Sequence, residues 1–381
     1  MERTIFEPEH DLFRESFRKF LDQHVAANHE QWEHDGIVDR TVWLEAGKQG
    51  FLGMAVPEEY GGGGVKDFRY NAVVTEEVTY GQYSGLGFGL HNDVIAPYLL
   101  ELANEEQKQR WLPGFCSGEI ITAIAMTEPG TGSDLQGIKT RAVKDGDDWV
   151  LNGSKTFITN GINADIVIVV AQTDPAKGAM GFSLLVVERG MAGFERGRNL
   201  DKIGLKAQDT AELSFQDVRV PGKNLFGTEG QGFIHLMQNL PQERLSIAVM
   251  AAAAMEGSLK GTIQYVRDRK AFGKPIGAQQ NTRFVLAELA TKTTAVRVFV
   301  DRCIELLNQE KLTVEEAAMA KYWSTEEQLD LITKCLQLHG GYGYMREYPI
   351  AKAYMDARVQ TIYGGTTEIM KEIIGRSLKL A

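Results

Sequence analysis

The chain has 381 residues, of which 43% are hydrophobic and 24% charged, as in a soluble globular protein of about two or three domains. Its net charge of −10 argues against nucleic acid as a partner, because binding to phosphates needs a positive field. No apolar run approaches the ~20 residues that a membrane-spanning helix needs, so we expect no membrane span.

Targeting and metal signals are weak in the sequence. Residues 1–7 are acidic and lack both the apolar core of a signal peptide and the Arg/Ser pattern of a transit peptide, so we expect a cytoplasmic protein. The cysteines are odd in number and dispersed, at Cys116, Cys303 and Cys335, which favours reduced thiols. No Cys/His cluster has metal-ligand spacing, so we predict no metal.

Residues 1–120 have a mainly helical pattern. Phe13, Phe17, Phe20 and Leu21 recur at helical spacing among charged residues, which predicts an amphipathic helix that buries this face.

Residues 121–232 have the pattern of strands. Residues 166–170 and 184–187 are short apolar runs, rich in β-branched residues, of buried-strand length. Asp145-Gly146, between residues 142–143 and 149–151, is a hairpin signal, because glycine supplies the positive φ that such turns need. The pattern predicts a compact antiparallel β domain.

Residues 233–381 are helical again. Thr313 and Glu316 have the spacing of a capping box and open an apolar-periodic run, which predicts a helix start. Gly340 and Gly341 predict its end, because glycine tolerates the left-handed conformation of a helix cap. Residues 241–244 read as a first helical turn, with Pro241 at its start and Glu243 facing the helix dipole.

Residues 125–134 form a loop rich in glycine, serine and threonine. Small residues let the backbone approach a flat or phosphorylated ligand closely, and hydroxyl groups can hydrogen-bond to it. No Gly-Lys-Ser/Thr follows, as in a P-loop, and no Gly-x-Gly-x-x-Gly follows a leading strand. By themselves these residues are typical of a turn, so a turn and a ligand site both stay open.

Together with residues 137–140 and 151–161, this loop resembles the signature of the acyl-CoA dehydrogenases, and the likeness spans essentially the whole chain. The resemblance implies an α+β protein with the acyl-CoA dehydrogenase fold. It would have an all-α N-terminal domain (1–120), a middle β-barrel-like domain (121–232) and a C-terminal four-helix bundle domain (233–381).

The resemblance also implies FAD, held between the β domain and the C-terminal bundle. The flavin edge would lie along Ile124, Ala125, Met126 and Thr127, with Gly132 and Ser133 near the ligand and Phe157, Ile158 and Thr159 over the ring system. The nucleotide end would contact Arg269, Phe272, Gln280, Gln337, Leu338, His339, Gly340 and Gly341, with Thr366, Thr367 and Glu368 next to the adenosine. In the family, Arg269 and its group come from a neighbouring subunit, so an oligomer, usually a tetramer, is implied.

The catalytic base distinguishes branches of this family. Many members carry a glutamate directly after the tyrosine that corresponds to Tyr363, where this chain has Gly364. Glu243 matches the alternative base of the long-chain and isovaleryl branch. Gly364 would keep the amide that binds the thioester carbonyl, and its missing side chain would leave room for Glu243. Glu368 is the other carboxylate that could act as the base. It lies four positions beyond the base position of the commoner branch, so we expect its side chain to point away from the substrate. Substrate contacts are expected from Ser133, Arg244, Tyr363, Gly364 and Gly365.

The implied function is the α,β-desaturation of an acyl-CoA to a trans-2-enoyl-CoA, with electrons passed to an electron-transfer flavoprotein. A medium- or long-chain fatty acyl-CoA is the first expectation, with an acyl cavity that involves residues 88–98. The alternatives are a branched short-chain (isovaleryl-type) or terpenoid substrate, an oxidase or flavin monooxygenase of the same fold, and a non-catalytic partner subunit.

Overall fold

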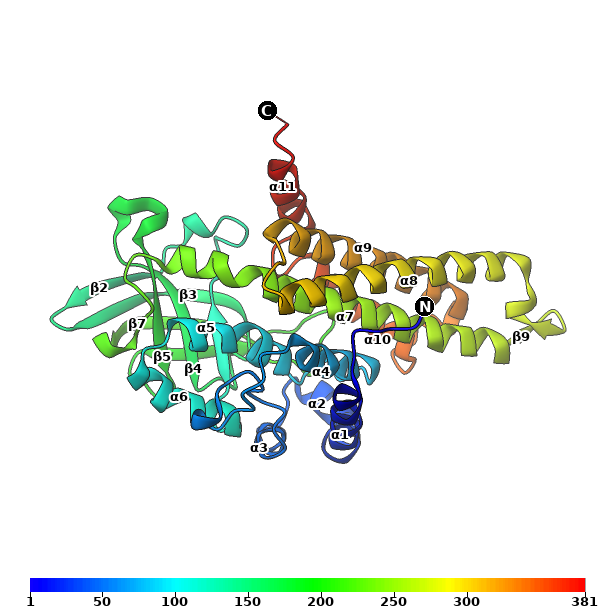
Figure 1. The fold of residues 1–381 in the computed structure, drawn as a ribbon, viewed down its shortest axis with the longest axis horizontal. Helices are drawn as coiled ribbons and strands as arrows, with labels where there is room; N and C mark the ends of the chain where they lie inside the picture. Colours follow the sequence, from blue (N-terminus) through cyan, green and yellow to red (C-terminus); the bar gives the residue numbers. More distant parts are fainter. Residues whose placement is uncertain (381) are drawn as a thin grey trace.

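Three structural units follow one another in the computed structural model, which describes residues 1–380 (Figure 1). The β sheet lies at one end of the long axis, and a small hairpin, β9 and β10, lies at the other. Long C-terminal helices join the two ends, and the N-terminal helices lie alongside.

The N-terminal unit is helical throughout. Its helices are α1 (Pro8–His24), α2 (His29–Asp35), α3 (Thr41–Lys48), α4 (Phe68–Tyr80), the π-helix η2 (Leu90–Ile95), α5 (Ala96–Leu102) and α6 (Glu105–Ser117). The predicted amphipathic helix is confirmed as α1, in which Phe17, Phe20 and Leu21 are buried. The switch to π-helical hydrogen bonding at η2 was not predicted, and such segments often occur at functional sites.

The middle unit is built on one eight-stranded sheet. Its strands are β1 (Thr122–Ala125), β2 (Arg141–Asp145), β3 (Asp148–Thr159), β4 (Ile166–Gln172), β5 (Phe182–Glu188), β6 (Phe194–Asn199), β7 (Thr210–Val220) and β8 (Leu225–Phe226). The strand order is β6-β7-β3-β2-β4-β5-β8, with β1 paired to β4. The hairpin between β2 and β3 is confirmed, with Gly146 at a φ of 63°.

The prediction of an antiparallel sheet was wrong for two pairings, because both β1 and β2 run parallel to β4, β2 at the single pair Arg141 and Gln172. β1 pairs with β4 in parallel, with Thr122 opposite Ile166 and Ala125 opposite Val169. A parallel partner must be reached by a crossover, and here the β2–β3 hairpin is part of that connection. All residues of β1 are buried, and a fully buried strand shows no alternation that would reveal its direction.

The C-terminal unit consists of long helices. Its elements are α7 (Gly232–Asp268), β9 (Lys270–Ala271), β10 (Lys274–Pro275), α8 (Gln280–Asn308), α9 (Val314–His339), α10 (Pro349–Ala357) and α11 (Thr367–Ser377). The capping box at Thr313 and Glu316 is confirmed at the start of α9, and Gly340 caps its end. Helix α11 packs on α9 and extends away from the body (Figure 1).

The predicted helix start at Pro241 was wrong. Helix α7 already begins at Gly232, so Pro241 and Glu243 lie inside it. Gly232 lies so close to β5 that a Cβ there would come within 3.0 Å of the Phe182 carbonyl oxygen. Contact with the sheet therefore sets the helix start, and Pro241 is accommodated within a helix whose tertiary packing outweighs the local signal.

The remaining short helices are 3-10 turns in the connections. They are η1 (Glu58–Tyr60), η3 (Leu135–Gly137), η4 (Pro175–Gly181), η5 (Gly222–Asn224), η6 (Ile276–Ala278), η7 (Gly340–Tyr344) and η8 (Arg358–Thr361). All three cysteines are buried free thiols. No helix within residues 1–380 is long and apolar enough to cross a membrane.

Candidate functional site

Glu243 lies on α7 with only 7% of its surface exposed. The hydroxyl group of Tyr98, on α5, donates a hydrogen bond of 3.0 Å to its Oε1. Burial raises the pKa of Glu243 to about 7, although the Tyr98 hydrogen bond and the charge of Arg244 both favour the ionised form. A carboxyl with this pKa can exist as a base near neutral pH and binds a proton more strongly than an exposed glutamate.

Two buried cations lie near the loop 363–365, and one of them, Arg244, is the sequence neighbour of Glu243. Arg244 is 4% exposed, and its Nε has no hydrogen-bond partner among the described residues. Lys321, on α9, is fully buried, and its Nζ donates a hydrogen bond of 2.6 Å to the carbonyl oxygen of Gly365. Burial, followed by the charge of Arg244, lowers the pKa of Lys321 to about 8. The two side chains place positive charge next to the loop 363–365.

The loop 363–365 packs against α7. Gly364 and Gly365 have φ values of 64° and 95°, a region that favours glycine. A Cβ at Gly364 would come within 2.4 Å of the Ile247 Cδ1 atom, and one at Gly365 would lie 4.0 Å from an Arg244 nitrogen. The expected room for Glu243 at Gly364 is therefore taken by Ile247, one helical turn further along α7.

The predicted flavin-edge residues meet at β1 and β3. Ile124 and Ala125 end β1 and are buried, and Met126 and Thr127 are half-buried just beyond it. The Thr156 amide donates a hydrogen bond of 2.9 Å to the Thr127 carbonyl oxygen, which joins the loop to β3.

Phe157 is exposed where a ligand is expected. Its side chain is 67% exposed and its φ is 61°, at a register shift between β3 and β7. Such irregularities re-aim side chains near sites, and a non-glycine residue in this region is strained. Ile158 is buried and Thr159 half-buried in the same strand, so Phe157 alone projects from this stretch. Gly132 and Ser133 lie in the exposed loop before η3.

The predicted nucleotide contacts form a second group at the far end of α7. A pocket of about 480 Å³ is lined by Arg269, the segment 337–341 and Tyr265, whose ring stacks on His339 at 4.0 Å. The Nδ1 atom of His339 is buried there without a partner among residues 1–380. Phe272 is 95% exposed at the tip of the β9–β10 hairpin, and Gln280 is exposed at the start of α8.

The third group surrounds the start of α11. Thr366 caps this helix and, with Thr367, Glu368 and Arg358, lines a pocket of about 550 Å³. Glu368 is exposed here, on a different element from the buried carboxyl Glu243.

These groups are not all brought together within one chain. Helix α7 starts beside the sheet and ends next to β9 (Figure 1), and Arg269 is the residue that follows its last turn. Its 37 residues span about 55 Å at the usual rise of 1.5 Å per residue. The flavin-edge residues and the Arg269 pocket therefore lie at opposite ends of a long helix.

Lys321 was missed as a site residue, and Tyr98 was expected only as the end of the acyl-cavity region 88–98 and not as a partner of Glu243. Tyr98 lies in an apolar run and is separated from Glu243 by 145 positions, so no local pattern connects them. Lys321 carries a weak signal, because this lysine follows the small apolar residues Ala317, Ala318 and Ala320, which are buried on the same helix.

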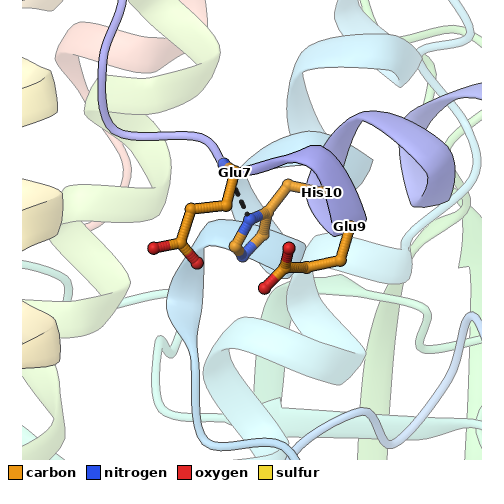
Figure 2. Close-up of side chains that lie close together, drawn as sticks. All are labelled: Glu7, Glu9 and His10. Carbon is orange, nitrogen blue, oxygen red and sulfur yellow. Dashed lines mark hydrogen bonds between the residues drawn. The ribbon is translucent and has the colours of Figure 1, made fainter.

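Glu7, Glu9 and His10 form a cluster with the spacing of a metal site (Figure 2). Figure 2 shows the His10 Nδ1 atom facing the Glu7 backbone amide, which donates a hydrogen bond of 3.1 Å to it. The Nε2 atom of His10 donates to Asp67 at 3.2 Å, so both ring nitrogens already have partners. The cluster is explained as the cap of α1, and we assign no metal to it.

Matches to three domain families cover nearly the whole chain. They are the N-terminal domain of acyl-CoA dehydrogenase at residues 7–119, the middle domain at 123–218 and the C-terminal domain at 230–379. The chain belongs to the acyl-CoA dehydrogenase family, which is a family of oxidoreductases. The predicted family, fold class and enzyme class are confirmed.

Individual members of the family differ in how similar they are to this chain. The chain is 53% identical to long-chain specific acyl-CoA dehydrogenase of Sus scrofa, over 99% of this chain and 88% of that protein. It is 35% identical to isovaleryl-CoA dehydrogenase of Pongo abelii, over 96% of this chain and 87% of that protein. The solved structure of acyl-CoA dehydrogenase from Geobacillus kaustophilus superposes with a TM-score of 0.97 at 51% identity, covering 98% of this chain and 99% of that one.

Two further solved structures concern the cofactor and the electron acceptor. A glutaryl-CoA dehydrogenase from Mycobacterium smegmatis in complex with FADH2 has a TM-score of 0.90 at 28% identity, over 98% of this chain and 95% of that one. A structure described as an electron transferring flavoprotein of Acidaminococcus fermentans has a TM-score of 0.93 at 35% identity, over the full length of both chains.

Proposed function

We propose that this protein is an FAD-dependent acyl-CoA dehydrogenase that converts a medium- or long-chain acyl-CoA to its trans-2-enoyl-CoA. The observation that carries this proposal is Glu243, a buried carboxyl with a pKa of about 7 on the part of α7 whose Arg244 and Ile247 lie against the loop 363–365. In this position a carboxylate can remove a weakly acidic proton from a substrate carbon with little competition from water.

The residues around Glu243 have complementary roles in this proposal. Glu243 removes the proton from Cα of the thioester. The Gly364 amide binds the thioester carbonyl oxygen, on which negative charge develops as the proton leaves. Arg244 and Lys321 add positive charge behind this loop. Bound FAD supplies the acceptor for the hydride from Cβ.

The residues present fit FAD at both ends. Phe157 offers an exposed aromatic face beside β1, where a flat ring can pack. Arg269 offers a guanidinium group suited to a pyrophosphate, and the unpartnered Nδ1 of His339 can accept a ligand hydrogen bond or, when protonated, donate one.

We propose an oligomer in which two chains complete each FAD site, as in the tetramers of the family. One dinucleotide cannot reach both ends of a helix about 55 Å long, so the Arg269 pocket serves a flavin held at another chain's sheet. Light scattering of the holoprotein tests this proposal. A tetramer is expected, and a monomer that keeps FAD would contradict it.

The substrate proposal rests on the relatives. Identity of 53% to a long-chain enzyme against 35% to an isovaleryl enzyme favours a medium- or long-chain acyl group. The acyl chain would lie near residues 88–98, where Leu90 and Val94 of η2 contribute half-buried apolar side chains. A branched short-chain or terpenoid acyl-CoA is the second candidate.

The electron acceptor and the location belong to the same proposal. We propose an electron-transfer flavoprotein as acceptor, supported by the family resemblance and by the Acidaminococcus structure. We also propose a cytoplasmic location, supported by the N-terminal sequence alone, although the Sus scrofa relative is described as mitochondrial. Fractionation of the source cells tests the location.

Anaerobic titration of the flavin-loaded protein tests the function. The panel runs from isovaleryl-CoA through octanoyl-CoA to palmitoyl-CoA, with citronellyl-CoA for terpenoids. We expect octanoyl-CoA or palmitoyl-CoA to remove the flavin absorbance and to yield the trans-2-enoyl-CoA. Reduction by isovaleryl-CoA or citronellyl-CoA alone would favour the second candidate. Bound flavin that no thioester reduces would favour the partner-subunit alternative, and rapid reoxidation by air would favour the oxidase.

A further inference from the structure

We propose that Tyr98 is a positioning residue for the catalytic base. Its hydroxyl group holds one oxygen of Glu243 and leaves the other free to receive the substrate proton. This inference rests on the proposed function, because it concerns the same carboxyl.

The geometry makes the hydrogen bond directional. Tyr98 is fully buried and Glu243 is 7% exposed, so water does not compete at the 3.0 Å contact. A carboxylate is an acceptor only, so the phenol must be the donor when Glu243 is ionised. Within residues 1–380, Tyr98 is the one side chain that donates a hydrogen bond to Glu243. A free glutamate side chain samples several rotamers, and this contact selects one of them.

The fold fixes the position of the donor through core packing and through contacts with α7. Tyr98 lies at the start of α5, directly after the π-helix η2, and packs in the core shared with β4 and β5. Asp93 of η2 accepts a hydrogen bond of 2.7 Å from Asn71 of α4. Its carbonyl oxygen accepts one of 2.7 Å from Gln242 of α7, and its side chain accepts one from Ser246 of α7. The segment that carries Tyr98 is therefore tied to α7 on either side of Glu243.

Titratable groups on α7 and on the elements packed against it must be separated from the effect of Tyr98. On α7 itself Arg244 favours the ionised form. Asp93 from η2 meets Ser246, Lys321 from α9 binds the Gly365 carbonyl, and Tyr363 faces Met250. Glu76 from α4 is paired with Arg297 and Arg3. A Tyr98→Phe variant removes one hydroxyl group and leaves all of these in place.

The sign of the effect follows from the direction of donation. A hydrogen bond to the ionised carboxylate lowers the pKa of Glu243, so its loss raises that pKa further above 7. A charge-assisted hydrogen bond in a buried site corresponds to about one pH unit or more. The matched control is Tyr60→Phe, which removes the hydroxyl group that donates 2.9 and 3.0 Å hydrogen bonds to Glu105, elsewhere in the same helical unit.

Infrared difference spectroscopy against pH measures the titration of the carboxyl directly in the holoprotein. The Glu243→Gln variant identifies the Glu243 band by subtraction. We expect a midpoint near 7 in the wild type, a midpoint about one pH unit higher in Tyr98→Phe, and no change in Tyr60→Phe. The acid limb of flavin reduction should move by the same amount as the midpoint. An unchanged midpoint in Tyr98→Phe would overturn the proposal.

A second substitution keeps the proposal testable if Tyr98→Phe folds poorly. Difluorotyrosine at position 98 retains the ring and makes the hydroxyl group a stronger donor, so the Glu243 midpoint should fall below that of the wild type. A midpoint that does not fall would also contradict the role of Tyr98. These spectra do not depend on turnover. If Glu243→Gln still reduced flavin, the base assignment would fail while the infrared result for Tyr98 stood separately.

Discussion

Glu243 lies where burial opposes its charge, so ionisation of this residue destabilises the fold that holds it. Its pKa is about 7 in the folded protein and 4.5 in an unperturbed glutamate. Between these values the folded state binds more protons than the unfolded state, so this group lowers stability as pH rises from 4.5 to 7. Burial of this carboxyl therefore makes it a stronger base and lowers the stability of the folded protein when it is ionised.

A Glu243→Gln variant should therefore gain stability relative to the wild type as pH rises. We expect little difference in Tm at pH 5 and a higher Tm for the variant at pH 8, with an upper limit of about 3 kcal/mol. Thermal unfolding at both pH values measures the difference. Equal differences at pH 5 and pH 8 would show that Glu243 does not have a raised pKa.

Gly364 is required both for its backbone and for its lack of a side chain. Alanine there would adopt a φ of 64° and meet the Ile247 Cδ1 atom at 2.4 Å. We expect Gly364→Ala to slow flavin reduction by at least about tenfold, because 1–3 kcal/mol of strain would displace the amide. Adding Ile247→Ala should restore part of the rate. If the double variant is no faster than Gly364→Ala, steric contact is not the cause.

At the scale of elements, the sequence predicted the features that depend on neighbouring residues. It did not predict those that depend on contacts between elements. The capping box at Thr313, the Gly146 hairpin and the Gly340 cap depend on residues a few positions apart, and all three are confirmed. The start of α7 depends on contact between Gly232 and β5, and the parallel pairing of β1 depends on a crossover. Neither leaves a local signature, and the same is true of the π-helix η2.

His91 connects η2 to α6 and β1 through hydrogen bonds, and its buried ring predicts how stability depends on pH. Its Nε2 donates a hydrogen bond of 3.0 Å to the Phe115 carbonyl oxygen of α6, and its Nδ1 accepts one of 2.9 Å from Thr122 of β1. Burial lowers the pKa of His91 to about 3, so the folded protein holds the neutral ring. The unfolded state binds more protons between pH 6.5 and 3, and stability must fall as pH falls through this range.

A His91→Gln variant can make both hydrogen bonds without titrating. We expect its stability at pH 7 to be reduced by about 1–3 kcal/mol, because glutamine loses the stacking of the ring on Phe115 at 3.6 Å. Its stability should fall less steeply than that of the wild type between pH 6.5 and 4.5. Chemical denaturation across this range measures how the stability of each protein depends on pH. Equal pH dependence in the wild type and the variant would show that His91 does not have a lowered pKa.

At the scale of the whole molecule, a buried ion network joins distant parts of the chain. Glu76 of α4 is fully buried between Arg3 of the N-terminal segment and Arg297 of α8, at 2.8 and 2.9 Å. Burial opposes its charge, but the charges of Arg297 and Arg3 hold the pKa of Glu76 below its usual value. The stability from this group is present above pH 4.5 and is lost as pH falls below that value.

Removal of this charge should loosen the contact between the N-terminal and C-terminal units. We expect Glu76→Gln to cost up to about 3–5 kcal/mol, because Arg3 and Arg297 lose their fully buried counter-charge and keep only Asp301 and Glu256, which are less buried. Asp145→Asn is the control, since its exposed pair with Arg219 should contribute less than about 1 kcal/mol. Urea denaturation of the two variants compares them, and similar losses would argue against the network.

The candidate site was predictable from the sequence only in part. Glu243 was predicted by its resemblance to the base of a family branch, and Phe157 and Arg269 were predicted by motifs that resemble flavin contacts. Tyr98 lies 145 positions from Glu243, and only the packing of α5 on α7 brings them together. The separation of the Arg269 pocket from the sheet is likewise a property of the length of α7.

The claim that Glu243 is the base is tested most directly by the rate of flavin reduction in rapid mixing experiments at pH 8 with saturating acyl-CoA. We predict a fall of about 10²–10⁴-fold for Glu243→Gln, the range expected for loss of a general base, with flavin and substrate still bound. Asp145→Asn, which removes an exposed carboxylate at the β2–β3 hairpin, should react within about threefold of the wild type. A Glu243→Gln variant that reduces flavin at the wild-type rate would contradict the account.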